Sequence, residues 1–183
     1  MTEEFEMLKD IASRLDSAGI EYMMTGSMAM ALYASPRMTR DVDIIIRVSP
    51  DDSGRIVELF QDEYYIEETA VRDAIKNRGM FNAIHNKSVI KVDFIIRKDD
   101  EYRLEEFSRR TITAVQGMSI SVVSPEDLIL SKLVWSKMSD SELQFRDARQ
   151  MLSALKDLDR AYMDTWAEKL HVGALLNKAR GHE

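Results

Sequence analysis

Two segments decide the fold: MMTGSMAM at residues 23–30 and DVDIII at residues 41–46. The first joins an apolar strand to a helix through a Gly-Ser pair. Thirteen residues separate that pair from the second segment, which carries two acids, Asp41 and Asp43, at the start of a β-branched strand. Side chains two positions apart lie on the same face of a strand, so both carboxylates face one side of a sheet.

The acid pair indicates a cation site at the beginning of this strand. Flexible carboxylates at this spacing can converge on one cation or bridge two, and Mg²⁺ usually takes one or two carboxylates together with substrate phosphates. The apolar residues 44–46 anchor the strand in the core. The alternative is an Asx turn followed by a solvated acid.

A third acid lies inside the later apolar stretch VIKVDFII, residues 89–96. Asp93 has Val92 and Phe94 as neighbours, and an acid in such a strand is costly unless it is paired or bound to a cation. The alternative is that Asp93 lies on the wet face of an antiparallel strand, with Lys91 on the same face.

Gly26 and Ser27 are placed to hold phosphate. The first turn of a helix presents unpaired N–H groups and a positive dipole end. Glycine permits close approach of the backbone, and serine supplies a hydroxyl. The alternative is an ordinary helix N-cap.

The remaining pattern predicts an α/β (α+β) fold with a mixed sheet flanked by helices. We expect a core over residues 1–123 and a C-terminal helical segment, packed on it, over residues 124–183. The expected strands are 20–24, 41–48, one near 64, and two hairpins, 80–84 with 88–96 and 111–115 with 119–123. The expected helices are 5–18, 28–34, 50–63, a stretch before 77, 125–138, and several within 141–180.

Composition limits the classes of function. Cysteine is absent and the three His lack metal-ligand spacing, so thiol nucleophiles are excluded and a structural zinc site is not expected. The net charge of -7 argues against a general nucleic-acid coat. We expect a cytoplasmic protein without membrane contact, because no long apolar run or signal-peptide pattern is present.

Taken together, these motifs resemble the nucleotidyltransferase superfamily typified by DNA polymerase β. Residues 25–29 and 37–44 are similar to its minimal bacterial members. Residues 124–133 and 146–152 resemble the branch of abortive-infection toxins. The resemblance extends over about residues 20–152 and implies the nucleotidyltransferase fold.

The resemblance also implies roles for the residues quoted above. Gly26 and Ser27 would hold the triphosphate. Asp41 and Asp43 would bind Mg²⁺ (or Mn²⁺). Asp93 would be the third metal-binding carboxylate and would also accept the proton of the attacking hydroxyl.

Three further residues match the family pattern. Lys132 would contact phosphate or nucleotide, and Asp147 would support Lys132 or the wall of the site. Arg40 would neutralise developing charge or pair with an acid. The alternatives for Lys132 and Asp147 are an ion on a helix surface and a salt bridge between helices.

These roles predict a magnesium-dependent nucleotidyltransferase that uses ATP, CTP, GTP or UTP. Its acceptor would be a hydroxyl of RNA such as tRNA, of a protein, or of a small molecule. One biological role would be that of a toxin paired with a cognate antitoxin. Two alternatives are a non-catalytic nucleotide- or partner-binding module of the same fold and an antitoxin-type interaction protein. Basic residues that would flank an RNA path are Arg72, Lys76, Arg78, Lys87, Lys91, Arg97 and Lys98.

Overall fold

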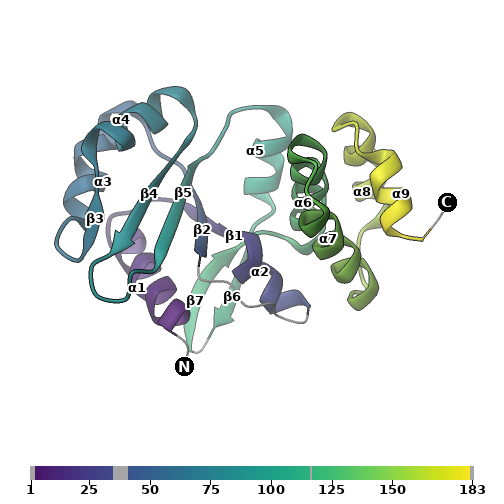
Figure 1. Ribbon diagram of the computed structural model, residues 1–183, viewed down its shortest axis with the longest axis horizontal. Helices are drawn as coiled ribbons and strands as arrows, with labels where there is room; N and C mark the ends of the chain where they lie inside the picture. The colour runs from purple at the N-terminus through teal and green to yellow at the C-terminus, as the bar shows by residue number, and fades with distance from the viewer. Residues whose placement is uncertain (1–2, 35–40, 116, 182–183) are drawn as a thin grey trace.

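A computed structural model describes residues 3–34, 41–115 and 117–181 (Figure 1). Its centre is a seven-stranded mixed sheet in the order β3-β4-β5-β2-β1-β7-β6. The strands are β1 (Tyr22–Thr25), β2 (Asp41–Ile46), β3 (Tyr64–Ile66), β4 (Met80–His85), β5 (Lys91–Ile96), β6 (Thr111–Val115) and β7 (Met118–Val122). This arrangement confirms the predicted fold class.

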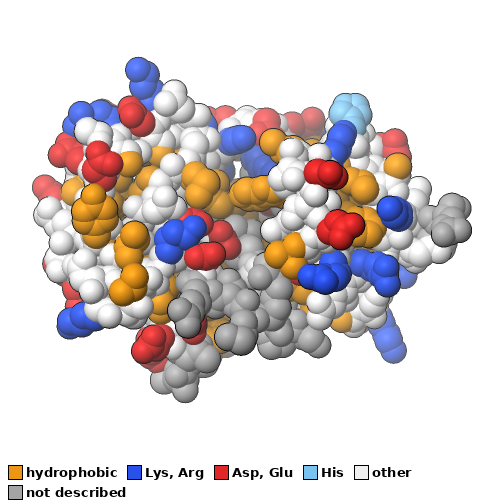
Figure 2. Space-filling view, in the orientation of Figure 1, with side chains coloured by type: hydrophobic (Ala, Val, Ile, Leu, Met, Phe, Trp, Pro, Cys, Tyr) orange, Lys and Arg blue, Asp and Glu red, His pale blue; other side chains and the backbone are white. Residues whose placement is uncertain are grey.

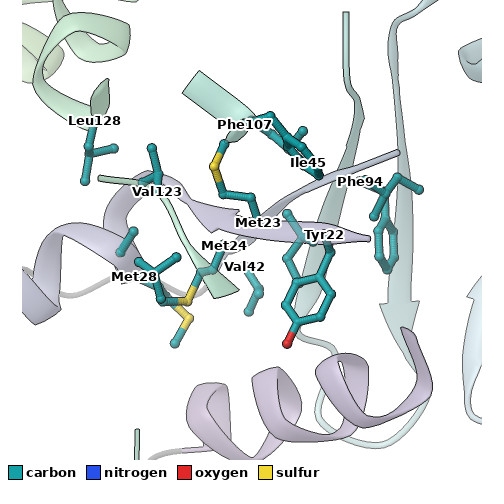
Figure 3. Packing of buried hydrophobic residues seen from close by; sticks show 14 of the residues in the cluster. Tyr22, Met23, Met24, Met28, Val42, Ile45, Phe94, Phe107, Val123 and Leu128 are labelled. Atoms are coloured by element: carbon teal, nitrogen blue, oxygen red, sulfur yellow. The ribbon is translucent and has the colours of Figure 1, made fainter. Parts of the chain in front are cut away.

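The central strands β1, β2 and β5 are apolar enough to be buried from both sides. Every residue of β1 is buried, and so are Val42 and residues 44–46 of β2. β2 runs antiparallel to β1 and parallel to β5. Near-continuous β-branched runs are typical of strands covered on both faces. Figure 3 shows the packing beneath these strands, where Met23, Met24 and Val42 lie together.

Helices cover the sheet and extend beyond one end of it (Figure 1). α1 (Glu3–Ser17) packs on β2 and β7, and α2 (Gly26–Tyr33) packs on β1 and β2. The 3₁₀ turn η1 (Pro50–Asp52), α3 (Ser53–Phe60) and α4 (Glu68–Asn77) lie beside the β3–β4 edge. The helix predicted to run to residue 63 therefore ends at Phe60, after a 3₁₀ start.

The C-terminal helices lie on the other side of α2, at the right of Figure 1. They are α6 (Pro125–Ser139), α7 (Glu142–Ala154), α8 (Arg160–Lys169) and α9 (Gly173–Ala179), and both α6 and α7 contact α2. α6 begins as its sequence predicts, because Ser124 accepts a hydrogen bond from the Asp127 backbone N–H and Pro125 occupies the first turn. In the described residues, no helix is long and apolar enough to span a membrane.

One helix was not expected from the sequence. α5 (Glu101–Ser108) connects β5 to β6 and buries Tyr102, Glu106 and Phe107. Glu106 is 1% exposed and accepts hydrogen bonds from Arg103 and from Ser131 of α6. These contacts join α5 to α6 and fix α6 relative to the sheet.

Candidate active site

Strand register brings the three predicted acids to one place. β2 and β5 are parallel neighbours, with Asp43 opposite Asp93 and Asp41 opposite Lys91. The two strands that carry the predicted acids therefore lie side by side. Figure 2 shows acidic and basic side chains together at the centre of this face, over β2.

The Asp93 carboxylate is buried and held from two sides. Asp93 is 7% exposed, which makes the wet-face alternative wrong. Asn82, its partner across the β4–β5 pair, donates to Oδ1, and the Lys91 ammonium lies 2.9 Å from Oδ2. Lys91 does share the face of Asp93, as the alternative assumed. Its ammonium, however, contacts the carboxylates of Asp93 and Asp41.

Asp43 is the most electrostatically perturbed acid of the group. Burial raises its pKa from 3.8 to about 6, and repulsion from Asp93 and then Asp41 adds to this effect. The positive charges of Lys132 and Lys91 oppose the shift. The three carboxylates are therefore close enough to repel one another, as expected of groups that share one cation.

Gly26 is required by its distance from Asp43. A Cβ atom on Gly26 would lie 2.0 Å from Asp43 Oδ2 and 2.9 Å from Asp43 Cβ. The backbone also has a φ of +69°, which glycine adopts without strain. The first turn of α2 therefore lies directly against β2, and any side chain at position 26 would occupy the space that the Asp43 carboxylate fills.

The helix begins at Gly26, two residues earlier than expected, and this changes the interpretation of Ser27. Ser27 is 8% exposed and lies inside the first turn. The N-cap position belongs to Thr25, whose side chain makes no capping hydrogen bond. The N-cap alternative for Ser27 is therefore wrong, and its backbone lies at the amino end of the helix, where N–H groups lack helical partners.

Lys132 and Asp147 form a buried pair between α6 and α7. Lys132 Nζ lies 2.8 Å from Asp147 Oδ2 and 3.0 Å from Gln144 Oε1. Lys132 is 4% exposed and Asp147 is 2% exposed. The surface-ion alternative is wrong, and the contact between helices is confirmed. Lys132 also lies close enough to lower the pKa of Asp43, so this ion pair adjoins the acid cluster.

The donor set fits a hard divalent cation, although the acids are not arranged as a closed metal site. In residues 3–34, 41–115 and 117–181, no group of three acidic or His side chains has metal-binding geometry. The Lys91 ammonium lies among these acids, 2.9 Å from Asp93 and 3.8 Å from Asp41. Oxygen-only donors on two adjacent strands, with mutual repulsion at Asp43, match the preference of Mg²⁺. Arg40 lies outside the described residues.

Two neighbours of the site had not been singled out from the sequence, Asn82 and Gln144. Their local sequence gives no signal, because each acts only through a partner that the fold supplies: Asp93 for Asn82 and Lys132 for Gln144. Lys91 had been noted only as a companion of Asp93 and as a member of the basic stretch. Its position opposite Asp41 could have been found only by pairing β2 with β5.

Four of the seven basic residues proposed to flank RNA form local ion pairs. Arg72 pairs with Glu68, Arg78 and Arg97 both pair with Asp99, and Lys91 pairs with Asp93. Such pairs reduce the net positive field that a phosphate backbone would meet.

The geometry described above can be compared with known proteins. A family model described as aminoglycoside-2''-adenylyltransferase matches residues 7–151, more than three quarters of the chain. The chain belongs to this family. It is therefore a nucleotidyltransferase, and the predicted superfamily is confirmed. No curated protein sequence matches the chain.

Solved structures that share the fold include the following three. An antigenic nucleotidyltransferase-like protein from Paracoccidioides brasiliensis has a TM-score of 0.63 at 16% identity, over 99% of this chain and 93% of that chain. The lincosamide antibiotic adenylyltransferase LnuA, in a lincomycin-bound structure, has a TM-score of 0.57 at 13% identity, over 85% of this chain and 98% of that chain. ANT(2'')-Ia in complex with adenylyl-2''-tobramycin also has a TM-score of 0.57, at 14% identity over 98% of both chains.

Proposed function

We propose that the protein transfers AMP from Mg²⁺-bound ATP to a hydroxyl group of a small cationic molecule of the aminoglycoside type. One observation carries the proposal: Asp43 lies in register with Asp93 and against Gly26. This arrangement puts a carboxylate that would bind the cation beside the amino end of α2, where a phosphate would bind.

The choice of acceptor rests on the family and on charge. The matching family is named for adenylyl transfer to an aminoglycoside, and the solved neighbours include enzymes with lincomycin or an adenylylated tobramycin bound. The chain has a net charge of -7, and its site carries three carboxylates. A polycationic acceptor is attracted by such a field, whereas RNA is repelled by it.

The site residues divide into a phosphate side and a carboxylate side. Gly26, Ser27 and the amino end of α2 would receive the triphosphate. Asp41, Asp43 and Asp93 would hold the divalent cation. When bound, this cation neutralises charge on the phosphates, and the protein then has to position the reactants correctly. Asp147 would keep Lys132 in place beside the site.

The reaction is a single displacement at the α-phosphorus of ATP. The acceptor oxygen forms a bond to the α-phosphorus, the bond from that phosphorus to the bridging oxygen breaks, and pyrophosphate leaves. The acceptor hydroxyl loses its proton, which Asp93 would take. Both Asp93 oxygens already accept a hydrogen bond, from Asn82 and Lys91, and each keeps a second lone pair that could take the proton.

The proposal is tested by asking what the protein adenylylates. Purified protein is incubated with Mg²⁺ and each of the four NTPs, together with tobramycin, lincomycin, total tRNA or a cell-protein extract. Mass spectrometry then detects the nucleotide adduct. We expect AMP on an aminoglycoside. An adduct on tRNA or protein would refute the small-molecule acceptor and would favour the toxin-like role, which stays a prediction.

Two variants control this assay. Asp43→Asn removes one charged ligand and is expected to abolish transfer while the protein stays folded. Asp51→Asn makes the same chemical change at an exposed position of η1 and is expected to leave transfer intact. If no acceptor is modified by the wild type under any condition, the proposed substrate class is wrong.

A further inference from the structure

Lys91 is the feature of the site that the proposed chemistry does not use. It is the first residue of β5, opposite Asp41 in the parallel pair with β2 and two positions before Asp93 on the same face. Its ammonium lies 2.9 Å from Asp93 Oδ2 and 3.8 Å from Asp41 Oδ1. One positive charge therefore contacts two of the three carboxylates.

The site needs such a charge when no cation is bound. The three acids repel one another, and desolvation makes this costly at Asp43. An ammonium among carboxylates offsets part of that repulsion. It also contacts carboxylate oxygens that a divalent cation would use, so Lys91 and the cation compete for them.

The two lysines near the acids differ in their freedom to move. Lys132 is 4% exposed and is held by Asp147 and Gln144. The side chain of Lys91 is 41% exposed, and its partner Asp41 is 54% exposed. Lys91 has a flexible stem at the start of a strand, so its ammonium can swing into solvent, whereas the ammonium of Lys132 cannot.

We propose that Lys91 is a removable counter-ion of the carboxylate site. In the cation-free protein it holds Asp41 and Asp93 together, and it gives way to the divalent cation that accompanies the nucleotide. Lys91 thereby lowers the affinity for free cation. The inference rests on the proposed function only in assuming that the acids bind a divalent cation.

The test measures Mn²⁺ binding and stability without any nucleotide. Calorimetry and electron paramagnetic resonance give the Mn²⁺ Kd, and thermal melts are recorded in chelator and in saturating Mn²⁺. The variants are Lys91→Met, which removes the charge and keeps the apolar stem, and Lys91→Arg, which keeps the charge. Lys98→Met is the matched control, because it makes the same change at an exposed position beyond the far end of the same strand.

We expect Lys91→Met to bind Mn²⁺ roughly three- to tenfold more tightly than the wild type, the range expected for losing partly exposed ion pairs. In chelator its melting temperature should fall by about 2–6 °C, and Mn²⁺ should restore it, so that its metal-induced shift exceeds that of the wild type. Lys91→Arg and Lys98→Met should both stay near the wild type in Kd and in melting behaviour.

Several results would overturn the inference. Equal or weaker Mn²⁺ binding by folded Lys91→Met would show that Lys91 does not oppose the cation. Weaker ATP binding with unchanged Mn²⁺ affinity would make Lys91 a phosphate ligand instead. A similar gain in Mn²⁺ affinity in Lys98→Met would show that the effect comes from the net charge of the protein and not from the position of Lys91. If Lys91→Met does not fold, the same comparison is made with Lys91→Gln. The wild type distinguishes failure of this inference from failure of the proposed function. If the wild type shows no Mn²⁺ binding that is lost on substitution of Asp43, the proposed function itself is contradicted.

Discussion

Gly26→Ala perturbs the contact on which the site depends. The added Cβ would lie 2.0 Å from Asp43 Oδ2, 2.6 Å from Cγ and 2.9 Å from Cβ. Contact with Cβ means that rotation of the carboxylate alone cannot relieve the collision. β2 cannot shift easily either, because it is paired with β1 on one side and β5 on the other.

Two costs add in this variant. Alanine at a φ of +69° costs about 1–2 kcal/mol, the usual penalty for a left-handed backbone with a Cβ. Overpacking against Asp43 adds roughly 1–3 kcal/mol. We therefore expect Gly26→Ala to lose about 2–5 kcal/mol of unfolding free energy. We expect at least 100-fold slower transfer, because a shift of about 1 Å in a catalytic group costs that much.

Gly19→Ala separates the two costs. Gly19 has a φ of +64°, but a Cβ there would meet nothing within 4 Å. It should lose only the backbone penalty and keep full transfer. Urea unfolding of both variants, together with Asp43→Ala and the double variant Gly26→Ala/Asp43→Ala, completes a double-mutant cycle. In the double variant the contacts with Oδ2 and Cγ are gone and only the 2.9 Å contact with Cβ remains, so part of the overpacking cost should disappear.

The reasoning is refuted if Gly26→Ala and Gly19→Ala lose the same stability and both keep transfer. It is also refuted if the cycle is additive, since additivity would mean that Gly26 and Asp43 do not touch.

Three further predictions follow from the same geometry. Because the pKa of Asp43 is raised to about 6, the folded state binds this proton more tightly than the unfolded state does. Metal-free stability should therefore fall by about 2–3 kcal/mol from pH 4 to pH 8, and Asp43→Asn should flatten that profile in urea titrations. Lys132→Met should cost about 3–5 kcal/mol by removing a buried charge from Asp147, and Lys132→Met/Asp147→Leu should recover most of it in the same assay. Tyr162→Phe, which removes a 2.6 Å hydrogen bond to buried Asp127, should cost about 1–3 kcal/mol by urea unfolding and leave Mn²⁺ affinity unchanged.

The central strands and their acids could be predicted because several local signals agree there. The β-branched run after Asp43, the apolar neighbours of Asp93 and the Gly-Ser pair each restrict the backbone. In the fold these elements are adjacent, with Asp43 next to Thr25 on one side and Asp93 on the other. Their order along the chain carried most of the information about the site.

The helix α5 could not be predicted because its apolar residues form no periodic stripe. Tyr102 and Phe107 are buried five positions apart, while Leu104 between them is 41% exposed. The helix is instead stabilised by the buried Glu106 and its contacts with Arg103 and Ser131. The Arg103 contact is local, between residues three apart, whereas the Ser131 contact depends on tertiary packing, which the local sequence does not encode.

The burial of Lys132 was missed although a signal for it exists. Residues 128–130 and 133 of α6 are all buried, which is the pattern of a helix enclosed on every side. A lysine in such a helix must be paired, so the loss of its charge carries the large cost given above. The partner Asp147 had been identified by the resemblance, but its burial had not.

The central claim is that Asp43 and Asp93 act as one cation-dependent site, and the most direct measurement is adenylyl transfer from α-labelled ATP. The rate is compared for the wild type, Asp43→Asn, Asp93→Asn and the double variant, all shown to be folded. Residues that act as a unit are strongly non-additive. Each single variant should therefore lose at least about 1,000-fold, and the double variant little more. Near-wild-type transfer by either folded single variant, or losses that multiply in the double variant, would contradict the account.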